Sequence, residues 1–162
     1  VYGPFGTWDG GREKAPAALC RKIINAKLTR DHRIGVWGDG EQTRSFMYID
    51  DCITGMDKIR ESGYSKPINL GSSEMVSINQ LIDMIEDIAG IKVEREYDLT
   101  KPQGVRGRNS DNTLIKEKVG WEPSVSLKDG LEKTYAWIYE QIKAGNQDVS
   151  LNYSQEGNSC AV

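Results

Sequence analysis

The chain has 162 residues, of which 38% are hydrophobic, which is enough for one globular domain with its own core. This composition excludes a disordered protein, and the formal net charge of −3 excludes nucleic-acid or membrane binding through bulk positive charge. No apolar run approaches the roughly 20 residues of a membrane span and no charged-then-apolar leader opens the chain, so we expect a cytoplasmic protein. A first residue of valine, not methionine, predicts a fragment.

Helices and short strands are expected to alternate through the first half of the chain. Pro16 suits a first helical turn, and apolar residues at helical spacing predict a helix over 15–28. The segment RIGVWGDGEQTRSFMYI at 33–49 predicts two extended pieces around a GDG turn, which we interpret as a hairpin-like excursion. Asp50 or Asp51 is expected to cap the next helix, and KPINLG at 66–71 is expected to be a short buried strand.

The second half is expected to hold three helices and one strand. Ser77 and Gln80 form an S-x-x-Q capping box before apolar residues at helical spacing, and Gly90 is expected to end that helix. KVEREY at 92–97 alternates like a solvent-facing strand, and helices are expected over 112–119 and 127–142. We therefore assign residues 1–145 to one domain, and the polar, aperiodic residues 146–162 to a flexible tail.

This alternation predicts the α/β class. Few strands are long and apolar, however, and no strand is followed by G-x-x-G-x-x-G, the pattern of a dinucleotide-binding loop. If the chain comes from a dinucleotide-dependent enzyme, its nucleotide-binding half is therefore missing. Cys20, Cys52 and Cys160 lack the spacing of metal ligands or a disulfide framework, and His32 stands in a charged turn, so no metal site is expected.

Basic residues form three clusters in an otherwise acidic chain. Two arginines two residues apart on an extended backbone point to the same side, which suits a phosphate group. Ion pairs with surface carboxylates are an equally good interpretation of these two arginines. For Lys14, which directly precedes a helix, spacing alone favours an ordinary solvated side chain. The clusters are Arg12, Lys14 and Lys22; Arg44; and Arg106 with Arg108.

Several motifs together resemble the carboxyl-terminal half of an extended short-chain dehydrogenase/reductase that acts on nucleotide sugars. They are VYGP at 1–4, WGDGEQTRSFMYIDD at 37–51, INLGSSEMVSINQL at 68–81 and GWEP at 120–123. Three further stretches are similar to the GDP-mannose 3,5-epimerase family, which converts GDP-D-mannose to GDP-L-galactose: GTWDGGREKAPAALCRK at 6–22, EQTRSF at 41–46 and GVRGRNSDNTLIKEK at 104–118. The resemblance runs from Val1 to about Leu151 and implies the substrate-binding part of a Rossmann-type enzyme.

The resemblance also implies roles for individual residues. Lys14 matches the general acid of the family, and Arg108 matches an arginine at the substrate pyrophosphate. In the chemistry that the resemblance implies, NAD takes hydride from C4 of the sugar and later returns it. The C4 ketone acidifies C3 and C5, which an acid and a base on opposite faces then invert. The other matched residues are substrate contacts: Glu13, Ala15, Lys22, Gln42, Thr43 and Arg44.

The remaining parts of such an enzyme are expected before Val1. They are the glycine-rich NAD loop, the Y-x-x-x-K pair and a cysteine that acts as the opposing base. We therefore expect residues 1–145 to bind a GDP-sugar but to be inactive alone, and the complete protein to be a homodimer. Two alternatives stay open: another nucleotide-sugar epimerase or 4,6-dehydratase of the same fold, and a nucleotide-sugar-binding domain without turnover.

Overall fold

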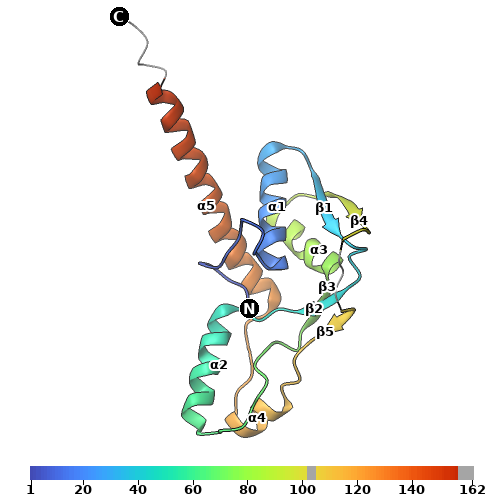
Figure 1. Ribbon diagram of the computed structural model, residues 1–162, viewed down its shortest axis with the longest axis vertical. Coiled ribbons are helices and arrows are strands. Elements are labelled where there is room, and N and C mark those ends of the chain that lie inside the picture. The colour runs from blue at the N-terminus through green and yellow to red at the C-terminus, as the bar shows by residue number, and fades with distance from the viewer. Residues whose placement is uncertain (102–104, 157–162) are drawn as a thin grey trace, which may run out of the picture.

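Helices and strands alternate along the chain, as the α/β class predicts (Figure 1). The computed structural model describes residues 1–101 and 105–156, and the side chains as far as residue 145. The helices are α1 (Ala15–Thr29), α2 (Ile49–Ser62), α3 (Ile78–Ala89), α4 (Thr113–Val119) and α5 (Leu127–Glu156). The strands are β1 (Arg33–Trp37), β2 (Thr43–Ser45), β3 (Met75–Ser77), β4 (Glu94–Asp98) and β5 (Gly107–Arg108).

The described strands form two small sheets. β1 pairs in parallel with β4, while β2 lies between β3, to which it is antiparallel, and β5, to which it is parallel. The hairpin expected over 33–49 is therefore wrong, because β1 and β2 belong to different sheets. Between them, Gly38 and Gly40 both have φ of 76°, a left-handed conformation that turns the chain and that glycine adopts without strain. Asn79 holds the turn by donating its backbone N–H to the Gly40 carbonyl at 3.0 Å.

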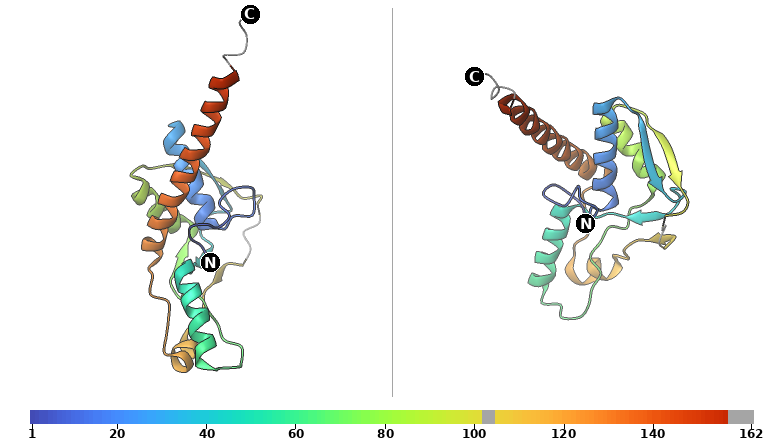
Figure 2. Two further views of the ribbon diagram at one scale, coloured as in Figure 1. Left: turned by 90° about the vertical axis from the view of Figure 1, so that its left-hand side faces the viewer. Right: turned by 45° about the horizontal axis from the view of Figure 1, so that its top comes forward.

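The core lies where α1 packs against α3 and α5. In the views of Figures 1 and 2, α1 lies between α5 and the β1–β4 sheet. Removing apolar side chains from water at this junction is the main force that holds the helices together. The fully buried aliphatic side chains at the junction are Ile23 and Ile24 of α1, Leu81, Ile82 and Ile85 of α3, and Leu131 and Ile138 of α5.

Helix α3 begins and ends where the sequence predicts. The Ser77 hydroxyl accepts the backbone N–H of Gln80 at 3.0 Å, and the Gln80 side chain accepts the backbone N–H of Ser77 at 2.8 Å. This reciprocal pair is the predicted capping box, which satisfies two backbone donors at the helix start. Gly90 closes the helix by donating its backbone N–H to the Glu86 carbonyl at 2.8 Å.

Helix α2 starts differently from the prediction. Its N-cap residue is Tyr48, not Asp50 or Asp51, and no side chain caps its first turn. Asp51 is instead buried, and one of its carboxylate oxygens accepts the backbone N–H groups of Ser124 and Val125 at 3.0 and 2.8 Å. The carboxylate therefore ties α2 to the segment before α5, a long-range role that the local sequence does not reveal.

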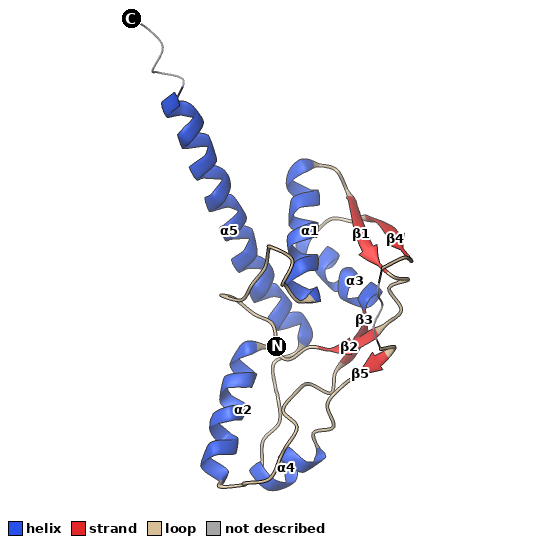
Figure 3. Cartoon of the chain, in the orientation of Figure 1, coloured by secondary structure: helices blue, strands red, loops and turns tan. Residues whose placement is uncertain are grey.

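Residues 66–71 do not form the predicted buried strand. Figure 3 shows this segment as a loop, and Pro67 and Asn69 in it are exposed while Ile68 and Leu70 are half-buried. A strand needs a neighbouring strand to pair its backbone groups, and no described strand pairs with this segment. Because none of residues 66–71 is fully buried either, both parts of the prediction, the strand and its burial, are wrong.

Helix α5 is longer than predicted. It continues through 146–156, which the sequence assigns to a polar tail, so the helix does not end at residue 145. The division of the chain at that residue and the flexibility of the tail stay predictions. Cys20 and Cys52 lie on α1 and α2 as free thiols, whereas Cys160 lies outside the described residues. Across 1–101 and 105–156, no helix has both the length and the hydrophobicity of a membrane span.

Gly130 lies where α5 packs closely against Tyr2. The Tyr2 hydroxyl donates to the Leu127 carbonyl at 3.0 Å, and a Cβ added at Gly130 would overlap that hydroxyl and lie 2.9 Å from Tyr2 Cζ. We expect Gly130→Ala to lower the free energy of unfolding by about 1–3 kcal/mol, measured by urea denaturation. Gly145→Ala is the control in the same helix, because beyond its neighbours in the helix no described atom lies within 4 Å of its added Cβ. The control should stabilise by about 0.5–1 kcal/mol, and equal losses at the two positions would contradict the packing described for Gly130.

Candidate functional site

Lys14 lies at the start of α1, directly after a glycine-rich loop. It is the N-cap residue, its backbone is extended (φ −80°, ψ 159°), and Pro16 occupies the first turn as predicted. The Lys14 side chain is exposed, and within the described residues it makes no hydrogen bond or ion pair. The local fold therefore leaves the Lys14 amine available to a ligand.

A cavity of about 420 Å³ lies between α1 and β1, next to Lys14. Glu13 and Ala15, which flank Lys14 in the chain, line it together with Lys22 and Gln42, whereas Lys14 itself does not. Four predicted substrate contacts from separate parts of the chain are thus brought together, and we call this space the helix–strand cavity. Its other lining residues are Gly11, Ala18, Leu19, Arg21, Gly35, Val36, Trp37 and Ile78.

Arg21 holds the Glu13 carboxylate at the edge of the helix–strand cavity. The Glu13 side chain is only 8% exposed, and its Oε1 accepts a hydrogen bond from Arg21 Nη2 at 2.8 Å. Glu13 Oε2 is buried and has no hydrogen-bond partner within the described residues. The nearby backbone N–H of Glu13 itself, and then the hydrogen bond from Arg21, lower the pKa of the carboxyl, although burial opposes the shift. The carboxylate is therefore charged at neutral pH.

The lowered pKa of Glu13 predicts that its contribution to stability is lost in acid. A carboxyl held below its ordinary pKa of 4.5 by the folded state stabilises that state above this value, and the effect disappears as pH falls through the folded pKa. We expect the difference in free energy of unfolding between the protein and its Glu13→Gln variant to be full above about pH 5 and to shrink below about pH 4. Urea denaturation at a series of acidic pH values measures it. A difference that does not change with pH would contradict the prediction.

Lys22 and Gln42 approach the same cavity from α1 and from the segment before β2. Lys22 Nζ donates to a carbonyl of β1 at 2.6 Å, and its pKa is lowered, first by burial and then by the charge of Arg21. Gln42 Nε2 donates to the Trp37 carbonyl at 3.1 Å, which leaves Gln42 Oε1 buried without a partner within the described residues. Buried hydrogen-bond acceptors normally have a donor. A ligand with N–H or O–H groups would supply the donors that Gln42 Oε1 and Glu13 Oε2 lack within the described residues.

Arg44 and Arg108 lie side by side in neighbouring strands. β2 and β5 are parallel, with Arg44 opposite Arg108, so both side chains leave the sheet on the same face. Both line a second cavity of about 280 Å³, which we call the arginine pocket, together with Asn69 and Ser110. Two guanidinium groups next to an amide and a hydroxyl suit a diphosphate. The remaining residues of this pocket are Ser45, Leu70 and Asn109.

The neighbour of Arg108 is thus Arg44, not Arg106 as the two-residue spacing suggests. Arg106 lies before β5, and its carbonyl accepts the backbone N–H of Thr43 at 2.9 Å. In the described part of the chain, neither Arg106 nor Arg108 forms an ion pair with a carboxylate. The ion-pairing alternative considered for these two arginines is therefore not what the structure shows.

The segment 42–44 joins the two cavities. Gln42 lines the helix–strand cavity and Arg44 lines the arginine pocket, and residues two apart on an extended chain are separated by ~7 Å. Thr43 lies between them and lines neither; its hydroxyl donates to the Arg106 carbonyl at 3.3 Å. One elongated ligand can therefore reach both cavities.

Sequence reasoning missed Asn69 and Ser110 of the arginine pocket, although both belong to motifs quoted for the resemblance, INLGSS and RGRNSDN.

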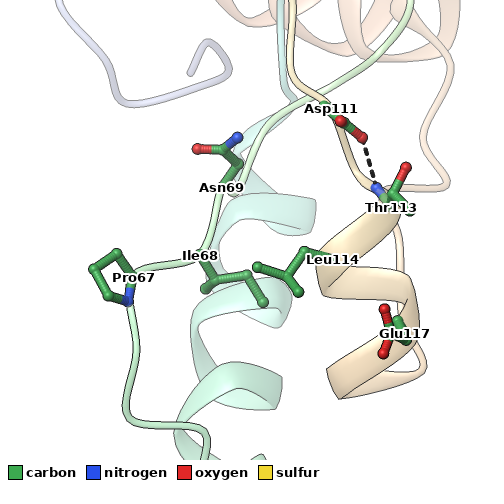
Figure 4. Close-up of a pocket in the computed structure, with 7 residues that line it drawn as sticks. All are labelled: Pro67, Ile68, Asn69, Asp111, Thr113, Leu114 and Glu117. Carbon is green, nitrogen blue, oxygen red and sulfur yellow. Dashed lines mark hydrogen bonds between the residues drawn. The ribbon is translucent and has the colours of Figure 1, made fainter.

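A third cavity, of about 390 Å³, lies between residues 67–69 and α4 (Figure 4). Ile68 and Leu114 point toward each other in it, and an Asp111 carboxylate oxygen accepts the backbone N–H of Thr113 at 2.9 Å. No predicted site residue lines this cavity, and its charged lining residues are Asp111 and Glu117. Carboxylates repel anions, so this cavity does not suit a nucleotide.

Comparison with known proteins decides the family. Residues 9–134 match the family model described as GDP-mannose 4,6 dehydratase. The chain belongs to this GDP-mannose 4,6-dehydratase family. Similarity to curated proteins agrees: a GDP-mannose 3,5-epimerase from Arabidopsis thaliana is 53% identical over 154 residues, which cover 93% of this chain and 40% of that protein. The chain therefore spans less than half the length of the curated relatives that it matches.

Similarity to solved structures confirms that this member of the GDP-mannose 4,6-dehydratase family has a Rossmann-type α/β fold. UDP-glucose 4-epimerase from Thermotoga maritima, with UDP-glucose, has a TM-score of 0.77 and 30% identity, covering 87% of this chain and 44% of that chain. UDP-glucuronic acid 4-epimerase from Bacillus cereus, in complex with UDP-glucuronic acid and NAD, has a TM-score of 0.70 and 31% identity, covering 87% and 43%. Both relatives are epimerases, and the second binds a nicotinamide cofactor.

Proposed function

We propose that the protein is a GDP-mannose 3,5-epimerase, which converts GDP-D-mannose to GDP-L-galactose. The observation that carries the proposal is the gathering of the matched substrate contacts into two cavities joined by residues 42–44, one of them next to Lys14. Glu13 and Gln42 line the helix–strand cavity, and Arg44 and Arg108 stand in register in the arginine pocket. The similarity to a curated enzyme of that name supports the same conclusion.

The two cavities suit the two ends of a nucleoside diphosphate. The guanidinium groups of Arg44 and Arg108 bind the diphosphate, because paired arginines match its charge and its fork of oxygens. The helix–strand cavity has apolar walls from residues such as Leu19 and Val36, which fit a flat base better than a sugar rich in hydroxyl groups. The proposal requires the sugar, on the far side of the diphosphate from the base, to come within reach of the exposed Lys14 amine.

Lys14 is the general acid in this proposal. A ketone at C4 makes the hydrogens at C3 and C5 acidic, so each carbon can lose a proton on one face and regain one on the other. The Lys14 ammonium delivers the proton on its own face of the ring. The resemblance implies a cysteine as the base on the opposite face; neither Cys20 nor Cys52 lines the two cavities, and Cys160 lies outside the described residues.

NAD is the cofactor of the proposed reaction, and when bound it supplies the reversible oxidation at C4. The residues of this chain do not form a binding site for NAD. The sequence has no G-x-x-G-x-x-G loop, and both cavities are lined by residues that match substrate contacts. We therefore assign NAD to a nucleotide-binding half of the enzyme. For the same reason, residues 1–162 alone are expected to bind the substrate without turning it over. The homodimer that the resemblance implies and the cytoplasmic location expected from the sequence are part of the same proposal.

A nucleotide-sugar 4-epimerase or 4,6-dehydratase is the second candidate, because a UDP-sugar epimerase shares this fold. A binding domain without turnover is the third. The deciding experiment uses the protein at the length of its curated relatives, purified with its cofactor and incubated separately with GDP-D-mannose and UDP-glucose. We expect nuclear magnetic resonance to show GDP-L-galactose from the first substrate only. Turnover of UDP-glucose alone, or binding of GDP-D-mannose without any product, would overturn the proposal.

A further inference from the structure

The loop that leads to Lys14 has few restraints of its own. Gly10 and Gly11 have φ of 88° and 83°, and apart from the flanking residues no atom of the described chain lies within 4 Å of the position where either would carry a Cβ. The loop runs before α1 as the dark blue segment of Figures 1 and 2. A loop of this kind samples many conformations unless another part of the molecule holds it.

Arg21 of α1 reaches back to both ends of this loop. Its Nε donates to the Trp8 carbonyl at 3.0 Å, and its Nη2 donates to Glu13 Oε1 at 2.8 Å. Its Nε also lies 3.5 Å from a carboxylate oxygen of Asp9. The Arg21 side chain is 23% exposed, so these contacts are partly shielded from water and stronger than contacts on the open surface.

We infer that Arg21 is a positioning residue for Lys14. Its guanidinium contacts residues 8, 9 and 13 at once. Because Lys14 directly follows Glu13 in the chain, the same contacts set the backbone position from which the Lys14 side chain extends. Lys14 itself has no side-chain partner in the described part of the chain to do this. The inference deepens the proposed function and rests on it for the catalytic role of Lys14.

Arginine is suited to this role in a way that lysine is not. The guanidinium is planar and offers several N–H groups in a fixed fork, so it can bond to a carbonyl and to a carboxylate at the same time. Lysine at position 21 would keep the charge but would place a single ammonium group near Glu13 or near Trp8. We therefore expect Arg21→Lys to retain part of the function that Arg21→Ala loses.

The experiment compares Arg21→Ala and Arg21→Lys with Arg60→Ala in the protein at the length of its curated relatives. Arg60 is a matched control, because it is 72% exposed on α2 and, among the described residues, its ion pairs are with its helix neighbours, Asp57 at 3.5 Å and Glu61 at 3.7 Å. Two measurements are made: amide hydrogen exchange of residues 8–14, with α3 amides as internal reference, and kcat with KM for GDP-D-mannose.

For Arg21→Ala we expect exchange in residues 8–14 to be about tenfold faster while α3 is unchanged. At saturating substrate, kcat should fall by on the order of 10- to 100-fold, because a catalytic group displaced by about 1 Å loses that much. The exchange rate and kcat of Arg21→Lys should lie between those of Arg21→Ala and the wild type. Both values for Arg60→Ala should match the wild type. Unchanged exchange in residues 8–14, or a loss confined to KM, would overturn the inference. If the wild type makes no GDP-L-galactose, the proposed function fails, and the exchange measurement still decides whether Arg21 holds the loop.

Discussion

Replacing Lys14 by alanine should reduce the rate of GDP-L-galactose formation by on the order of 10²- to 10⁴-fold, the usual contribution of a general acid or base. The proposed role of Lys14 is to deliver a proton to the sugar ring, and alanine carries no proton to deliver. Binding of GDP should change little, because Lys14 lines neither the helix–strand cavity assigned to the base nor the arginine pocket assigned to the diphosphate. Product formation measured by nuclear magnetic resonance and GDP binding measured by calorimetry test the two parts.

Two further variants separate the acid role of Lys14 from its charge. Lys14→Arg keeps the positive charge but holds its proton too tightly to give it up, so it should be as inactive as Lys14→Ala. Lys58→Ala removes an exposed lysine of α2, whose partner is Glu61 at 3.8 Å, and should leave the rate unchanged. GDP-L-galactose formed by Lys14→Ala at close to the normal rate would show that Lys14 is not the acid.

Replacing Arg108 by alanine should weaken the binding of GDP-D-mannose by about 10- to 100-fold. A hydrogen bond to a charged group contributes about 1.5–3 kcal/mol, and the loss removes one of the two guanidinium groups of the arginine pocket. The effect should appear in KM more than in kcat, because in the proposed function Arg108 binds the diphosphate and does not act on the reacting carbons. Binding of GDP to the wild type should also weaken as salt is added, since salt screens charge pairs.

Arg106→Ala is the matched control for this loss. Arg106 is two residues away and also exposed, but it stands outside the register that pairs Arg44 with Arg108, and its backbone carbonyl rather than its side chain bonds to Thr43. It should therefore change KM much less than Arg108→Ala. Equal losses in the two variants would indicate general attraction by positive charge, and no loss in Arg108→Ala would remove the diphosphate from this pocket.

Features that depend on neighbouring residues in the chain were predictable from the sequence. The capping box of Ser77 and Gln80 and the closing Gly90 give α3 both of its ends, because each is a bond between residues within one helical turn. Strand pairing was not predictable in the same way. The turn at Gly38 and Gly40 is equally typical of a hairpin, whereas β1 pairs with β4, a strand far along the chain that no local pattern connects to it.

The candidate site was likewise predictable only in part: its individual residues were predicted from the motifs, but not how they lie together. Resemblance of motifs selected Glu13, Gln42 and Arg108 individually, and the structure places them in two cavities joined by residues 42–44. The pairing of Arg44 with Arg108 depends on the register of β2 and β5, which no local pattern encodes. The contacts of Arg21 were missed for a related reason, since an arginine inside a helix has the spacing of an ordinary surface residue.

The proposed function is tested most directly by the position of solvent deuterium in the product when the reaction is run in D₂O. If Lys14 and an opposing base exchange protons at C3 and C5 while C4 loses and regains its own hydrogen, GDP-L-galactose should carry deuterium at C3 and C5 and none at C4. Lys14→Ala should yield almost none of this labelled product. A product inverted at C4, or one without deuterium at C3 and C5, would contradict the proposed epimerase.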